Sequence, residues 1–158
     1  MKGSGDDSGD ATCSIARALQ LIGDRWSLLI IREAFQGLQH FNEFQKSLGL
    51  AKNILSARLK KLVEGGVFEI HPDAETAVSH RYVLTPRGEQ LGVVLVALWQ
   101  WGAKNCFLDG ELKVEMVDSL YEKPLALLNL SSRDGRVLGP RDFRLVKRTT
   151  RQSSAKCA

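Results

Sequence analysis

Apolar residues recur at helical spacing through the first part of the chain, from residue 13 to about residue 35. The pattern is interrupted by the pair Gly23-Asp24. Because a glycine followed by a short polar residue punctuates helical patterns, this stretch predicts two helices with a tight junction between them. The apolar residues that recur at helical spacing are Ile15, Leu19 and Ile22 before the junction, and Trp26, Leu29 and Ile30 after it.

A compact pair of helices is predicted next. Residues 41–48 form one short amphipathic helix, residues 49–50 a turn, and residues 51–63 a second helix. The apolar faces consist of Phe41, Phe44 and Leu48 in the shorter helix, and Leu55, Leu59 and Leu62 in the longer one. Two such helices joined by a glycine-containing turn are typical of a helix-turn-helix.

After Gly65-Gly66 the periodicity changes from helical to alternating. Residues 67–71 and 80–84 predict two strands of a hairpin, with a polar loop over residues 72–79. Thr85-Pro86 is a favourable helix start, and one last helix is predicted from there to about residue 106. This order predicts a mainly α-helical winged helix-turn-helix in which the hairpin is the wing.

Composition divides the chain further. Residues 1–12 are small, polar and acidic, which predicts a disordered lead-in before a domain of residues 13–106. Residues 107–146 are expected to hold the end of the last helix and a second hairpin that turns at Asp134-Gly135. Residues 147–158 predict a disordered basic tail.

The net charge of +4 depends mainly on the C-terminal end. Residues 133–158 carry eight Lys and Arg against two Asp, a net charge of +6, which leaves −2 for residues 1–132. The folded body is therefore close to neutral, and a basic tail alone is weak evidence for a nucleic-acid partner.

Several classes of protein are disfavoured by what the sequence lacks. It has no apolar run long enough for a membrane span and no signal-peptide pattern near residue 1, so we expect a cytoplasmic protein. Three widely spaced cysteines with no C-x-x-C pair argue against a zinc site, and we expect no metal or cofactor. Nucleotide-binding, metalloprotease and nucleophile-elbow motifs are missing as well, so we expect no enzyme.

Spaced motifs make the resemblance more specific than the fold class. Residues 21–30 (LIGDRWSLLI), 40–44 (HFNEF), 54–62 (ILSARLKKL) and 82–88 (YVLTPRG) follow one another in the order found in HxlR-type regulators, relatives of the MarR group. The resemblance covers roughly residues 13–106. It implies a homodimeric regulator, expected to be a repressor, that binds a palindromic operator in double-stranded DNA. The dimer surface would come from the first and last helices.

Two positions depart from the family pattern. His40 stands where members usually have a basic residue, so we expect it to contact a phosphate, but more weakly or in a pH-dependent way. Ala51 stands where Ser or Thr is usual, which removes a helix cap worth about 1 kcal/mol.

The polar face of the longer helix holds the candidate DNA-binding residues. We expect base contacts from Lys52, Asn53, Ser56 and Ala57, and a phosphate contact from Lys60. These residue types suit base edges, although a plain solvated helix face is the alternative.

His80 and Arg81, on the return strand of the wing, are expected to reach a phosphate or the minor groove. A charge that merely protects an edge strand is equally compatible. The alternative function is a winged helix that contacts only proteins. Such a module would be expected to lack exposed basic side chains on the longer helix.

The last helix has more apolar side chains than a single buried face would need. A second copy of the chain could cover the remainder, which agrees with a dimer. The interface residues expected are Ile15, Leu19, Leu91, Leu95, Leu98 and Trp99. Cys13 lies where the first helix begins, a position that favours a thiolate. The resemblance extends redox sensing to Cys13 only, and a packing role or a small-molecule effector stays open.

Overall fold

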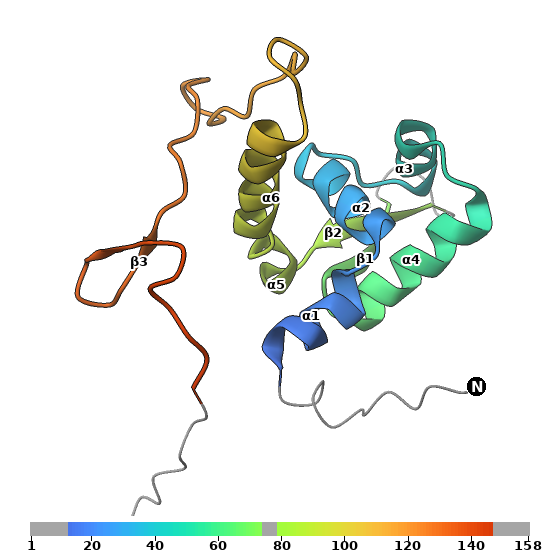
Figure 1. The fold of residues 1–158 in the computed structure, drawn as a ribbon. Helices are drawn as coiled ribbons and strands as arrows, with labels where there is room; N and C mark the ends of the chain where they lie inside the picture. The colour runs from blue at the N-terminus through green and yellow to red at the C-terminus, as the bar shows by residue number, and fades with distance from the viewer. Residues whose placement is uncertain (1–12, 74–78, 147–158) are drawn as a thin grey trace, which may run out of the picture. The chain divides into compact units, whose positions relative to one another are not determined.

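The computed structural model describes residues 13–73 and 79–146 (Figure 1). The predicted lead-in, the tip of the wing and the predicted basic tail lie outside the described residues. The elements, in order, are α1 (Ser14–Ile22), α2 (Arg25–Phe35), α3 (Phe41–Leu48), α4 (Lys52–Glu64), β1 (Phe68–Pro72), β2 (His80–Leu84), α5 (Pro86–Glu89), α6 (Gly92–Asn105), β3 (Leu130–Ser131) and β4 (Val137–Leu138). The predicted fold class, mainly helical with a small antiparallel hairpin, is confirmed.

The chain divides into two units between Lys113 and Val114. The first holds α1 to α6 and the β1–β2 hairpin, and the second holds the β3–β4 hairpin. In the first hairpin the strands are antiparallel, with Phe68 opposite Leu84 and Pro72 opposite His80. Within the described residues no helix has the length and apolar character needed to cross a bilayer.

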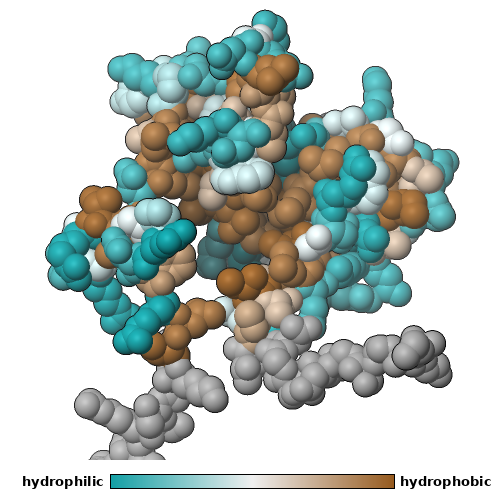
Figure 2. All heavy atoms as spheres, in the orientation of Figure 1, coloured by the Kyte–Doolittle hydropathy of each residue, from teal (hydrophilic) through white to brown (hydrophobic). Residues whose placement is uncertain are grey.

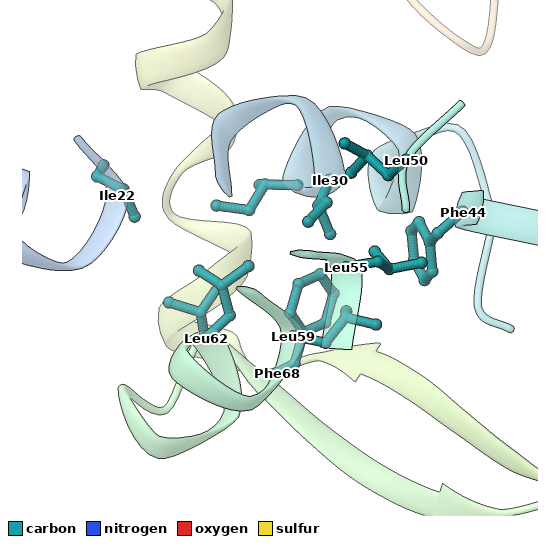
Figure 3. Close-up of a cluster of buried hydrophobic side chains, with 10 residues drawn as sticks. Ile22, Ile30, Phe44, Leu50, Leu55, Leu59, Leu62 and Phe68 are labelled. Atoms are coloured by element: carbon teal, nitrogen blue, oxygen red, sulfur yellow. The ribbon is translucent and has the colours of Figure 1, made fainter. Parts of the chain in front are cut away.

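One hydrophobic core holds the helix-turn-helix and the wing together (Figure 3). Phe44 of α3 and Phe68 of β1 are almost completely buried, and their rings meet edge to face at 6.4 Å between centroids. The aliphatic side chains buried around these rings are Ile22, Ile30, Ile31, Leu50, Leu55, Leu59, Leu62 and Val67. Because four helices and a strand contribute, α4 is fixed to the rest of the unit along its whole apolar stripe.

Glycines shape the connections on both sides of α4. Gly49 ends α3 in the left-handed conformation, with a φ of 63°, and so permits the short turn that leads into α4. After α4, Gly66 has a φ of 68°, and the amide of Val67 donates to the carbonyl of Leu62 at 2.9 Å. This hydrogen bond closes the end of the helix and directs the chain into β1.

The prediction of one continuous last helix is wrong. Thr85 caps α5 as expected, accepting a hydrogen bond from the Gly88 amide at 3.1 Å, but α5 ends at Glu89. The Leu91 amide then donates to the Gly88 carbonyl, three residues back, which tightens the chain before α6 begins. Leu91 and Leu95 are thereby able to pack on the core.

Gly88 is required where α5 lies against Val67, the residue before β1. A Cβ at this position would lie 2.2 Å from the Val67 carbonyl oxygen, a backbone atom that cannot move aside locally. We therefore expect Gly88→Ala to lower the free energy of unfolding by about 1–3 kcal/mol, measured by urea denaturation. Gly102→Ala is the matched control, because nothing lies within 4 Å of a Cβ there. Equal effects of the two substitutions would contradict this interpretation.

Candidate nucleic-acid interface

The polar face of α4 lies opposite the buried stripe of Leu55, Leu59 and Leu62. All five side chains predicted to face DNA from this helix are exposed, namely Lys52, Asn53, Ser56, Ala57 and Lys60. The structure thus brings the predicted residues together on one accessible surface. Ala51 occupies the cap position with an extended backbone, and no side chain caps the helix there.

Asp24 anchors α4 to the start of α2. Its carboxylate caps α2 by accepting from the amide of Ser27 at 3.0 Å and from its hydroxyl at 2.7 Å. It also pairs with two cations of α4, at 3.1 Å to Arg58 Nε and 3.7 Å to Lys61 Nζ. One carboxylate therefore fixes both the helix start and the flank of the neighbouring α4.

Two opposing influences act on the pKa of Asp24. Partial burial raises the pKa, but the hydrogen bonds from Ser27 and the charges of Arg58 and Lys61 outweigh it. The net pKa lies below the ordinary value of an aspartic acid, so the carboxylate is ionised at neutral pH.

Glu33, in the last turn of α2, anchors α3 to α2. It is 8% exposed, and its Oε2 accepts a hydrogen bond from the Ser47 hydroxyl at 2.6 Å. Arg32 pairs with the other carboxylate oxygen. Burial raises the pKa of Glu33, but the hydrogen bonds from Ser47 and Arg32 and the charge of Arg32 lower it by more. The net pKa lies below the ordinary value of a glutamic acid, so Glu33 remains an anion.

His40 connects α3 with the wing. Its Nδ1 lies 3.2 Å from Glu43 Oε2, and its Nε2 lies 3.2 Å from Asp73 Oδ2 at the end of β1. Both ring nitrogens thus face carboxylates within the chain. A phosphate contact by His40, as predicted, would compete with one of these partners.

Arg81 also lies against the scaffold. Its guanidinium is 3.4 Å from the side-chain oxygen of Gln39, and its backbone forms an isolated bridge with His40. The next residue, Tyr82, donates its amide to the Gln39 carbonyl at 2.8 Å. His80, one residue earlier, is exposed. Of the two predicted wing contacts, His80 is the more accessible.

The helices predicted to form a dimer carry exposed apolar side chains. In α1, Ile15 and Leu19 are 62% and 56% exposed, and in α6, Leu98 and Trp101 are 48% and 64% exposed. Hydrophobic side chains are visible over both helices in Figure 2. The other predicted interface residues are only half-buried, namely Leu91, Leu95 and Trp99.

A cavity of about 460 Å³ opens beside α1. Its apolar wall includes Leu21, Val67 and Leu91, and its polar lining includes Arg17 and Arg87. Cys13 caps α1 without a side-chain hydrogen bond, and Cys106 follows α6 as a free, exposed cysteine. In the described part of the chain, no group of three or more His, Cys, Asp or Glu is arranged to hold a metal ion.

Sequence reasoning missed Asp24 and Glu33 as positioning residues. Asp24 carried a readable signal, since Asp three residues before Ser27 at a helix start is a capping pattern. Glu33 carried none, because a glutamate in an amphipathic helix normally faces solvent. Its burial depends on Ser47, which lies on another helix.

The helix-turn-helix followed by a hairpin defines a winged helix-turn-helix protein. Residues 21–109 match the family of HxlR-like helix-turn-helix proteins, and the chain belongs to this family. An uncharacterized HTH-type transcriptional regulator of Mycobacterium tuberculosis is 45% identical over 89 residues, 56% of this chain and 56% of the relative. The chain thus spans about half the length of such relatives. The HTH-type transcriptional regulator YodB of Bacillus subtilis is 30% identical over 100 residues, 62% of this chain and 89% of that protein.

Solved structures agree with the family. The crystal structure of PA1607, a candidate transcription factor, is 45% identical with a TM-score of 0.83, and the alignment covers 90% of this chain and all of that one. Reduced YodB from B. subtilis superposes with a TM-score of 0.53 at 30% identity, covering 60% of this chain and 95% of YodB.

Charge removal at Asp24 tests its anchoring role. Asp24→Asn keeps a capping oxygen but loses the attraction to Arg58 and Lys61, so we expect a loss of about 1 kcal/mol in the free energy of unfolding at pH 7. Because the folded pKa is lowered, the carboxylate stabilises the fold above about pH 4, and this contribution disappears as the pH falls through the folded pKa. The variant should therefore lose less stability than the wild type between neutral pH and about pH 3.

Glu64→Gln is the control for that measurement. It removes the Lys60–Glu64 pair on the same helix, in which the nitrogen and oxygen are 3.8 Å apart and the side chains are 75% and 65% exposed. Such an exposed pair is worth about 0.5 kcal/mol or less. Urea titrations at several pH values that gave the same curves for both variants would refute the anchoring role of Asp24.

Proposed function

We propose that the protein regulates transcription by binding a specific duplex sequence as a homodimer, with α4 as the recognition helix. The observation that carries the proposal is the exposed face of α4, on which Lys52, Asn53 and Ser56 project from a helix held on its other side by the core. The family relationship and the names of the relatives support a regulatory role. We infer repression as its effect and a palindromic operator as its target.

The residues of this face suit base recognition. An asparagine such as Asn53 can bond an adenine edge with two hydrogen bonds, and a lysine such as Lys52 can reach guanine in the major groove. The small Ala57 leaves room for a thymine methyl group. In a two-fold dimer the two copies of α4 would lie about 34 Å apart, one turn of DNA.

A winged helix that binds only proteins is the competing function. Such a module would have no use for lysines at the start and middle of α4. Lys52 and Lys60 are both exposed, and the partner of Lys60 is the exposed Glu64 on the same helix. The availability of these cations favours DNA over a protein partner.

We further propose that the regulator responds to oxidants through Cys13, with a small molecule in the cavity beside α1 as the second possibility. YodB has been solved in reduced and in diamide-treated form. In this chain Cys13 is partly buried at the start of α1, on the helix whose exposed side chains we assign to the dimer. Oxidation there would act on the packing of the two copies.

Two kinds of α4 variant test DNA binding. Lys52→Ala and Asn53→Ala should each weaken operator binding about 5- to 100-fold, because each removes a contact to a base. Lys60→Ala should weaken all duplexes alike and reduce the slope of affinity against salt by about one unit. Arg133→Ala removes a cation outside the first unit and is the control. Fluorescence anisotropy with DNA upstream of the gene measures all four, and wild-type affinity in the α4 variants would refute the proposed reading surface.

Cys13→Ser tests the redox response. Diamide should change the operator affinity of the wild type and leave that of Cys13→Ser unaltered. Cys106→Ser shows whether the other free cysteine of the described chain is the partner, since a bridge needs Cα atoms about 4.4–6.8 Å apart. If diamide leaves the wild type unchanged, Cys13 is a packing residue and the effector must be sought in the cavity.

A further inference from the structure

The second unit follows a defined path but has no core of its own. None of residues 114–146 is buried. Its order comes from local polar contacts: Asp118 accepts from the amides of Leu120, Tyr121 and Lys123, and the short β3–β4 hairpin is paired in register. Hydrogen bonds of this kind, exposed to water, contribute little stability alone.

Large apolar side chains of this segment are exposed throughout its length. Eleven of them are at least 40% exposed, among them Leu120 at 76%, Leu127 at 75% and Leu145 at 87%. Soluble proteins rarely leave so many large apolar side chains of one segment open to water unless a partner covers them. The segment therefore requires a partner surface.

Charge argues against DNA as that partner. Residues 114–146 contain five acidic and five basic residues, so their net charge is zero. Binding to the phosphate backbone depends on a basic excess, which this segment lacks. The partner must instead offer apolar surface.

The comparisons show which relatives have this segment. The alignment with PA1607 covers 90% of this chain, more than residues 1–113 could supply, whereas 60% of this chain accounts for 95% of YodB. PA1607 therefore shares at least part of the second unit, and YodB has no room for it.

We propose that residues 114–146 form an arm that packs against a second copy of this chain, on the apolar surface of its α1 and α6. The inference rests on the proposed homodimer and extends it. In the first unit, α1 and α6 together expose six large apolar side chains, namely Ile15, Leu19, Val93, Val94, Leu98 and Trp101. These side chains give the first unit an exposed apolar surface that the arm of another copy can cover.

Reciprocal arms would cover both exposed apolar surfaces. A two-fold dimer pairs each arm with the helices of the other copy, so both sets of exposed side chains are covered at once. The arm contributes eleven exposed apolar side chains and the two helices six, so each copy brings seventeen to the interface. A second copy is the partner that is always present at matching stoichiometry.

The test uses the full chain with three substitutions in the arm, Leu127→Ser, Phe143→Ser and Leu145→Ser. All three side chains are more than 60% exposed, so the fold of either unit should not change. Sedimentation equilibrium should show the dimer dissociation constant rising by at least about 100-fold. The matched control, Lys123→Ser with Arg133→Ser and Arg141→Ser, removes polar side chains of the same segment and should leave the constant within about threefold of the wild type.

A second measurement locates the contact. Isotopically labelled wild type is mixed with an unlabelled copy that carries a spin label at Ser119→Cys, with its native cysteines changed to serine. Line broadening at α1 and α6 of the labelled copy supports the arm. A dimer without such broadening, or with an unchanged dissociation constant in the triple variant, overturns the arm but leaves the regulator intact. A monomeric wild type refutes both the arm and the homodimer.

Discussion

The position of α4, the proposed recognition helix, depends on two carboxylates at opposite ends of α2. Asp24 at its start pairs with Arg58 and Lys61 of α4, and Glu33 in its last turn accepts a hydrogen bond from Ser47 of α3. The apolar core holds α4 along its buried stripe. Ion pairs at one end of α2 and a hydrogen bond at the other add polar contacts at two separated points, so α2 holds both α4 and α3.

This arrangement also provides a physical route from the proposed dimer surface to the proposed DNA-binding surface. Asp24 follows α1 after only Gly23, and the Gly23 amide donates to the Leu19 carbonyl at 2.8 Å. A Cβ on Gly23 would lie 2.3 Å from that oxygen, so the junction has little slack. A displacement of α1 therefore moves Asp24, and with it the flank of α4. An effector or an oxidised Cys13 that shifts α1 would act along this path.

Sequence periodicity predicted the elements well because each buried stripe is local. Leu55, Leu59 and Leu62 identify α4 and its exposed face without knowledge of any other helix. The break between α5 and α6 was not predictable in this way, since α5 lies where Gly88 approaches the Val67 carbonyl, a contact between segments distant in the sequence. The same limit explains His40: its position before the helix is visible in the sequence, but its bond to Asp73 depends on how the wing folds back. Residues whose role depends on a neighbour in space were missed, whereas exposure along one face of a single helix was predictable.

At the start of α4 the chain lacks a helix cap, and the proposed DNA binding offers a reason for this loss of stability. Ala51 cannot cap the helix, which forgoes about 1 kcal/mol, and it leaves the first amides of α4 without a side-chain acceptor. A serine there would satisfy these amides but would also place its own oxygen in front of them. With alanine, the amides and the exposed Lys52 form a positive helix terminus that can meet a phosphate directly. Because residues 1–132 carry a net charge of −2, long-range attraction to DNA is weak in this part of the chain, and local donors at the N-terminus of α4 matter correspondingly more.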